Sequence, residues 1–190
     1  MNQSRFQPRA VWFLIPVMLM LLGSLITAYQ ELQSVNLVVR ETAVGLTQGW
    51  HTQVDNFLQY LPLLMFLLIP GELRWWERVL LGLVCILVLQ GFTESIKHTT
   101  LVLRPDASTP NSFPSGHTGT SFVNATLLAV YCRKRPAVGT FGYLVALSVG
   151  CLRILNNRHW TSDVLFGAGL GICVVLVIYW LYCKLTKKEE

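Results

Sequence analysis

Charged residues are scarce in this chain. Asp, Glu, Lys and Arg make up 13% of its 190 residues, whereas a soluble domain usually carries about 25%. Hydrophobic residues account for 53%, so there are too few charged groups to cover a water-soluble globule. The composition therefore excludes an ordinary soluble domain and indicates that the chain lies in a lipid bilayer.

The chain also lacks the patterns of several common functional classes. Its five cysteines show no CxxC spacing, which favours apolar filler over a zinc or redox motif. The Gly-rich string at 167–171 lies within an apolar run and follows no strand, so it is not a nucleotide loop, and its small residues are expected to allow close helix packing. The basic run at 133–135 separates two apolar runs, where basic residues determine membrane topology, and we therefore expect no nucleic-acid partner.

Long uncharged runs divide the chain into segments of membrane-spanning length. A spanning helix needs about 20 mostly apolar residues, or fewer where its terminal side chains reach back to the membrane surface. We therefore expect an all-α fold, a six-transmembrane-helix bundle in which residues 1–190 form a single membrane-embedded domain. The expected spans are 11–29, 55–71, 77–97, 116–132, 136–152 and 163–183.

The distribution of basic residues predicts how this bundle is oriented. With six spans both termini lie on one side, and that side holds ten of the 15 Lys and Arg residues: Arg5, Arg9, Arg74, Arg78, Arg133, Lys134, Arg135, Lys184, Lys187 and Lys188. The other side holds Arg40, Lys97, Arg104, Arg153 and Arg158. Because basic residues concentrate in cytoplasmic loops, the termini are expected to be cytoplasmic.

The segment 31–54 is expected to connect the first two spans on the outer side. Leu32, Val35, Val38 and Val39 recur at near-helical spacing with polar residues between them. This pattern fits an amphipathic helix at the membrane interface that could cradle a lipid, and it fits a packed connector equally well.

Three short motifs carry most of the reactive side chains, and all three fall on the outer side. They are Lys97-x6-Arg104-Pro105, Pro114-Ser115-Gly116-His117 and Arg153-x5-His159-x3-Asp163. A phosphate ester is an anion whose cleavage depends on positioning and electrostatic stabilisation. Three basic side chains beside these motifs favour anion binding over simple anchoring at the membrane surface.

The second motif predicts a helix start. Pro105, Pro110 and Pro114 preclude a regular helix before it, so the next helix is expected to begin around Ser115 to His117. Unpaired backbone N–H groups at a helix start favour a bound anion. The Ser115 hydroxyl is expected to donate to a phosphate oxygen, to cap the helix, or to do both.

The third motif predicts a paired histidine and carboxylate. His159 and Asp163 are four residues apart and would share one face of a helix, so the carboxylate would orient the imidazole for attack. His117 is the candidate proton donor. His117, His159 and Asp163 would also make a passable metal-ligand set. The neighbouring cations would repel a divalent ion, so we expect no metal and no other cofactor.

Together these motifs resemble the three-part signature of the type 2 phosphatidic acid phosphatase (PAP2) superfamily of lipid phosphatases. The resemblance covers about residues 55–183, with a motif core at 94–170, and departs from the family at Leu152, where a serine is usual. It implies a PAP2-type helix bundle with His159 as the nucleophile, Asp163 as its orienting group and His117 as the acid. The implied phosphate ligands are Lys97, Arg104, Ser115, Gly116 and Arg153.

The resemblance also implies a class of substrate. We expect an integral membrane phosphatase that hydrolyses a phosphate monoester of an outer-leaflet lipid. Lipid A is the preferred substrate, because the sequence around the motifs is similar to that of bacterial members of the family. The alternatives are an undecaprenyl pyrophosphate or phosphatidylglycerol phosphate phosphatase, or a lipid phosphotransferase using the same site. The expected location is the bacterial inner membrane, with the active site facing the periplasm. The sequence leaves the oligomeric state open.

Overall fold

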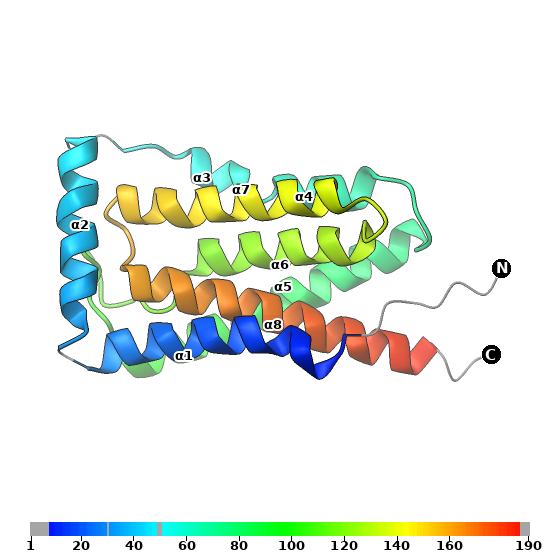
Figure 1. Ribbon diagram of the computed structural model, residues 1–190, viewed down its shortest axis with the longest axis horizontal. Coiled ribbons are helices and arrows are strands. Elements are labelled where there is room, and N and C mark those ends of the chain that lie inside the picture. The colour runs from blue at the N-terminus through cyan, green and yellow to red at the C-terminus, as the bar shows by residue number, and fades with distance from the viewer. Residues whose placement is uncertain (1–7, 30, 49–50, 187–190) are drawn as a thin grey trace.

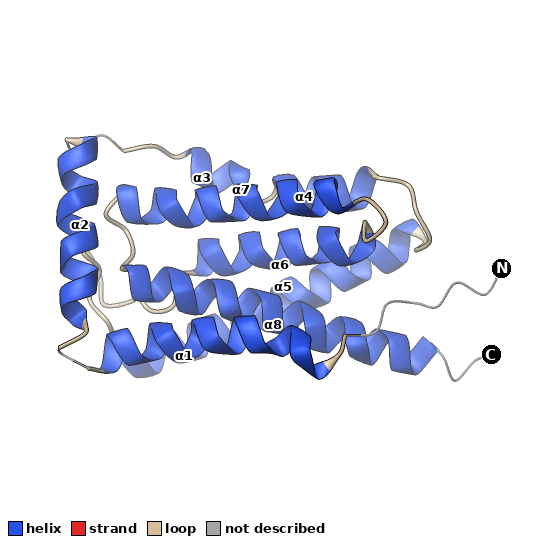
Figure 2. Cartoon of the chain, viewed as in Figure 1, coloured by secondary structure: helices blue, strands red, loops and turns tan. Residues whose placement is uncertain are grey.

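The computed structural model describes residues 8–29, 31–48 and 51–186, and within them every regular element is a helix (Figure 2). The elements are η1 (Ala10–Phe13, a 3-10 helix), α1 (Leu14–Ala28), α2 (Gln33–Thr47), α3 (Val54–Leu58), α4 (Leu61–Leu68), α5 (Trp75–Thr100), α6 (Gly116–Tyr131), α7 (Pro136–Leu155) and α8 (Thr161–Thr186). The expected all-α class is confirmed. Arg5, Lys187 and Lys188 of the topology prediction lie outside the described residues.

The long helices run along one axis, and α2 lies across one end of the bundle (Figure 1). Helix α1 begins and α8 ends at the opposite end (Figure 1). Helix α6 is at the centre, where it packs against α4, α5, α7 and α8. Residues 118–128 of α6 are all buried, and Val123, Leu127 and Leu128 form the main hydrophobic core with Leu89 and Val175.

Within the described residues, four helical segments are long and apolar enough to cross a membrane: Ala10–Ala28, Trp75–Thr100, Pro136–Leu155 and Thr161–Thr186. They correspond to four of the six expected spans. The expected span 55–71 is divided into α3 and α4, and α6 has 16 residues. A helix enclosed by other helices needs neither full length nor a continuous apolar surface, which explains the buried Thr118, Ser121 and Asn124 of α6. The count of six spans remains a prediction.

The expected helix in the connector is present as α2, and its polar side faces the bundle. Asn36 is buried and exchanges two hydrogen bonds with Ser162, while Arg40 Nε donates to Asn157 Oδ1 at 3.1 Å. Val35 and Val38 of the apolar stripe are exposed. The polar contacts therefore attach α2 to the bundle, and its placement at a membrane interface stays a prediction. Residues 49 and 50 of the connector are not among those described.

Small residues bring α8 into close contact with α6, as the Gly-rich string at 167–171 predicted. A Cβ atom on Gly167 would lie 2.6 Å from the Ser115 carbonyl oxygen. Real Cβ atoms do not approach an oxygen so closely, so only glycine fits at this position. The start of α6 is thereby set directly against α8.

Candidate active site

The three motifs meet at the end of the bundle where α2 lies. They occupy the last turns of α5 and α7, the first turns of α6 and α8, and the loops between them. A cavity of about 610 Å³ opens among them. Six of the eight predicted site residues line it: Lys97, Arg104, Gly116, His117, Arg153 and His159. The other two, Ser115 and Asp163, are buried, with exposed fractions of 1% and 0%.

The predicted pair of His159 and Asp163 forms, although its local structure differs from the expectation. His159 Nδ1 lies 3.3 Å from Asp163 Oδ2. His159 is not on a helix, because α8 begins at Thr161. The carboxylate instead reaches back from the first turn of α8 and also accepts a hydrogen bond from the Trp160 backbone N–H at 2.9 Å. A first-turn carboxylate that accepts from the residue before a helix is a common capping arrangement.

Ser112 is a third partner of this carboxylate and belongs to none of the three motifs. Its hydroxyl donates to Asp163 Oδ2, the oxygen that faces His159. Ser112 is completely buried although it lies in the most polar outer segment, and its backbone N–H donates to the Val102 carbonyl. Nothing in the local sequence distinguishes it from the exposed Ser108, so only the folded loop reveals this contact.

Opposing electrostatic effects act on the pKa of His159. The pKa of His159 is lowered, first because burial disfavours its charged form and further because Arg153 and Arg104 are close. The hydrogen bond and negative charge of Asp163 oppose this shift. With Nδ1 hydrogen-bonded to Asp163, the Nε2 atom of a neutral imidazole carries the lone pair. Burial thus keeps this side chain in the form that can act as a nucleophile.

The basic residues of the cavity repel one another. The pKa of Arg104 is lowered by burial first, and then by the positive charges of Arg158 and Arg153. Arg104 Nε donates to Asn111 Oδ1 at 2.8 Å, and Lys97 Nζ pairs with Glu94 at 3.0 Å. An anion between these cations would relieve their repulsion.

Arg153 combines burial with an unsatisfied donor. Its guanidinium Nη1 forms a 2.6 Å ion pair with Asp55 Oδ2, and its side chain is only 9% exposed. Its Nε is buried and has no hydrogen-bond partner within the described part of the chain. A buried N–H without a partner costs about 1–3 kcal/mol, so a ligand oxygen that accepts from it is strongly favoured.

The second motif forms the predicted helix start. Helix α6 begins at Gly116, and the Ser115 side chain accepts from the Thr118 backbone N–H at 3.5 Å as its N-cap. The Ser115 hydroxyl is also 2.9 Å from the Thr118 hydroxyl. The capping role of Ser115 is thus present, whereas its contact with a phosphate remains a prediction. His117, one residue into the helix, has its Nε2 2.9 Å from Asn56 Oδ1.

Helix α3 contributes two cavity residues that no motif contains. Asp55 contacts Arg153, and Asn56 contacts His117. Both residues lie at the edge of the expected span 55–71, where the sequence pattern indicates no role for them. A long-range ion pair between residues 98 positions apart has no local sequence signal.

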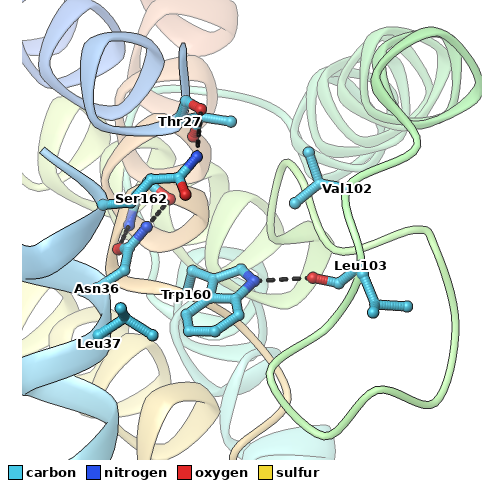
Figure 3. Close-up of a pocket in the computed structure, with 8 residues that line it drawn as sticks. Thr27, Asn36, Leu37, Val102, Leu103, Trp160 and Ser162 are labelled. Carbon is cyan, nitrogen blue, oxygen red and sulfur yellow. Dashed lines mark hydrogen bonds between the residues drawn. The ribbon is translucent and has the colours of Figure 1, made fainter. Parts of the chain in front are cut away.

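A smaller pocket of about 260 Å³ lies beside the site (Figure 3). Figure 3 shows the Trp160 indole crossing it to donate from Nε1 to the Leu103 carbonyl at 2.8 Å. Trp160 follows His159 and Leu103 precedes Arg104, so this bond ties together the loops that carry two predicted site residues. Asn36 and Ser162 close the other wall (Figure 3). Among the described residues, no group of three or more His, Cys, Asp or Glu side chains could hold a metal ion.

These features define a multi-pass, all-α membrane protein with a cation-lined pocket that contains histidines at one end of its bundle. The chain belongs to the PAP2 superfamily, whose family model matches residues 78–187, more than half of its length. The resemblance deduced from the three motifs is confirmed.

Two curated proteins are similar to this chain in sequence. The chain is 36% identical over 170 residues to a lipid A 1-phosphatase of Porphyromonas gingivalis, covering 80% of this chain and 38% of that protein. It is 36% identical over 76 residues to the bacitracin transport permease protein BcrC of Bacillus licheniformis, covering 40% of this chain and 36% of the relative. The chain thus spans less than two fifths of the length of either relative.

Two solved structures have the same fold. The PAP2-type phosphatidylglycerolphosphate phosphatase of Bacillus subtilis superposes with a TM-score of 0.65 at 23% identity, over 92% of this chain and 96% of that one. Aquifex aeolicus LpxE superposes with a TM-score of 0.55 at 23% identity, over 73% of this chain and 92% of that one. These similarities establish a PAP2-type architecture.

Proposed function

We propose that this protein is a membrane lipid phosphatase that hydrolyses a phosphate monoester through a phosphohistidine on His159. The observation that carries the proposal is the pairing of His159 with Asp163 in a cavity lined by Lys97, Arg104 and Arg153. The buried Nε of Arg153 supplies a donor for a phosphate oxygen. These cations neutralise the charge that a metal ion would otherwise neutralise, so catalysis without a metal is proposed.

The proposed reaction has two steps. His159 Nε2 attacks phosphorus, the bond to the lipid oxygen breaks, and His117 gives that oxygen a proton. His117 then takes a proton from water as the water oxygen attacks the phosphohistidine. This step releases inorganic phosphate and restores both histidines. Asp163 holds the His159 ring and stabilises its positive charge during the first step.

A lipid A phosphate is the preferred substrate. The similarity to a lipid A 1-phosphatase over 80% of this chain supports this class. Within the described residues, Arg9, Arg74 and the basic turn at 133–135 lie at the end of the bundle opposite the cavity, which supports a site at the outer face of a bacterial inner membrane (Figure 1). The substrate head group would then lie in the outer leaflet.

The substrate proposal is tested with purified protein and a panel of lipid A, phosphatidylglycerol phosphate and undecaprenyl pyrophosphate, with mass spectrometry of each lipid. Loss of phosphate from lipid A is expected. Loss of phosphate from only one of the other lipids would show that this lipid is the substrate, and the proposed phosphatase activity would still stand. Phosphate release that requires an acceptor lipid would identify a phosphotransferase instead.

The nucleophile is tested by His159→Ala. This change should abolish phosphate release, by at least about 10⁴-fold, because the proposed mechanism assigns the covalent intermediate to His159 alone. Rapid denaturation of the wild type during turnover of a ³²P-labelled lipid should trap an acid-labile phosphoprotein that His159→Ala lacks. His98→Ala, an exposed histidine at the end of α5, is the matched control and should retain full activity. Full activity of His159→Ala would disprove the assignment.

A further inference from the structure

Helix α3 places two adjacent polar side chains on the wall of the cavity. Asp55 and Asn56 both line it, and each bonds a different predicted site residue. Asp55 Oδ2 is 2.6 Å from Arg153 Nη1, and Asn56 Oδ1 is 2.9 Å from His117 Nε2. Neither residue belongs to the three motifs.

The Asp55 carboxylate is itself held in place. It is 1% exposed, and its second oxygen accepts from Asn156 Nδ2 at 3.3 Å. Asn156 in turn bonds both the N–H and the carbonyl of Thr52, at 3.0 and 2.8 Å. Because the carboxylate cannot rotate freely, it sets the direction of the Arg153 guanidinium. Asp55 occupies Nη1, while Nε has no partner among the described residues.

Asn56 bonds the imidazole of His117 and makes no contact with Arg153 among those described. An amide oxygen only accepts hydrogen bonds, so the bond to Asn56 Oδ1 requires a proton on His117 Nε2. His117 lies at the start of α6, where it has no other hydrogen bond from its ring among those described. The amide therefore holds the Nε2 side of the ring, and the proton for the leaving oxygen would come from Nδ1 of the doubly protonated ring.

We propose that Asp55 and Asn56 are separate positioning residues: Asp55 orients Arg153 toward the phosphate, and Asn56 orients His117 toward the leaving oxygen. This inference rests on the proposed phosphatase activity. It explains why an acidic residue is tolerated beside a site for an anion. The Asp55 charge is paired with Arg153, and this ion pair orients the guanidinium.

The role of Asn56 is tested by comparing leaving groups. An alkyl lipid oxygen must be protonated as it leaves, whereas p-nitrophenolate is stable as an anion. Asn56→Ala should lower kcat about tenfold or more with the lipid phosphate, and less than about twofold with p-nitrophenyl phosphate. An unchanged ratio between the two substrates would overturn the role of Asn56. This ratio does not depend on the amount of folded protein, because both substrates are tested on one sample. Asn56→Ser is the second variant if Asn56→Ala does not fold.

The role of Asp55 is tested by binding. Asp55→Asn should raise KM and the inhibition constant of inorganic phosphate by about tenfold with both substrates, and leave their kcat ratio unchanged. Asp55→Glu should recover part of this loss, because it keeps the charge that pairs with Arg153. Tighter phosphate binding in Asp55→Asn would overturn the proposal, since it would show that the carboxylate only competes with the ligand for Arg153.

Gln53→Ala is the matched control for both tests. Gln53 lines the same cavity wall but bonds neither Arg153 nor His117. It should leave KM, the inhibition constant and the substrate ratio within about twofold of the wild type. If the wild type releases phosphate from no substrate, the proposed function fails. If the wild type is active and the Asp55 and Asn56 variants behave like Gln53→Ala, only the present inference fails.

Discussion

At the scale of single residues, the environment of His159 determines how activity should depend on pH. Burial lowers the pKa of this imidazole, and the nearby Arg153 and Arg104 lower it further. Asp163 raises it, but the net shift is downward. The nucleophile must be neutral to attack, so a lowered pKa extends activity toward acid.

We expect the acidic limb of kcat/KM that belongs to His159 to lie below pH 6.5, about the ordinary value for histidine. Arg104→Gln removes one of the charges that face His159 and should move this limb to higher pH, while also raising KM. A pH series on the wild type and on Arg104→Gln measures both effects. A limb in the wild type above pH 6.5 would contradict the assignment of this limb to His159. An unchanged limb in Arg104→Gln would show that the Arg104 charge does not lower the pKa of His159.

Ser112 should act on catalysis through Asp163. Ser112→Ala removes the hydroxyl that donates to the carboxylate beside His159, and we expect kcat to fall about tenfold with little change in KM. Ser108→Ala is the matched control in the same loop, because its exposed hydroxyl bonds Asp106 and not Asp163. Equal activity of the two variants would show that the Ser112 contact does not matter.

At this scale the sequence predicted which side chains meet at the cavity, but not the residues that they bond. His159 and Asp163 come together because four residues of chain can bring them close across a helix start as well as within a helix. The sequence did not predict the contacts of Asp55, Asn56 and Ser112, because each residue is separated from its partner by 51 to 98 positions along the chain. Such contacts depend on how whole helices pack, and local spacing does not encode them.

At the scale of elements, close contact between α6 and α8 supports the site. Gly167 allows the Ser115 carbonyl to approach α8, and the Ser115 N–H donates to the Asp163 carbonyl at 3.1 Å. The two helix starts that carry His117 and Asp163 are therefore bonded directly. The small residues at 167–171 predicted close packing but not which helix would be the partner.

Gly167→Ala should push these helix starts apart. The new methyl group would lie 2.6 Å from the Ser115 carbonyl oxygen, which is backbone and cannot rotate away. We expect a loss of about 1–3 kcal/mol in stability and a marked loss of activity. Gly91→Ala in α5 is the matched control, since none of the described residues outside its own helical turns lies within 4 Å of the added methyl group. It should be neutral or stabilising by up to about 1 kcal/mol, because alanine favours helix more than glycine. Thermal unfolding in detergent compares the two, and equal stability would contradict the packing argument.

At the scale of the whole molecule, the bundle separates its charges along its axis. The candidate site lies at one end with α2, and the starts of η1 and α5 and the turn between α6 and α7 lie at the other (Figure 1). Between them, α1 and α5 expose large apolar side chains such as Leu14, Met18, Leu83 and Leu87, as helices that face lipid do. Hydrophobic runs and charge bias were enough to predict this layout. They did not predict that α6 would be enclosed, because the composition of an enclosed helix is determined by the helices that pack around it and not by contact with lipid.

The orientation in the membrane can be tested with single cysteines at the two ends. Thr109 and Arg135 are both exposed, in the loop beside the cavity and in the turn between α6 and α7, respectively. Cys151 is the exposed cysteine among those described and is first replaced by serine. A membrane-impermeant maleimide added to intact spheroplasts should label Thr109→Cys and should label Arg135→Cys only after lysis, because the basic end is expected to be cytoplasmic. Labelling in the reverse order would place the cavity in the cytoplasm, and a substrate in the outer leaflet would then be out of reach.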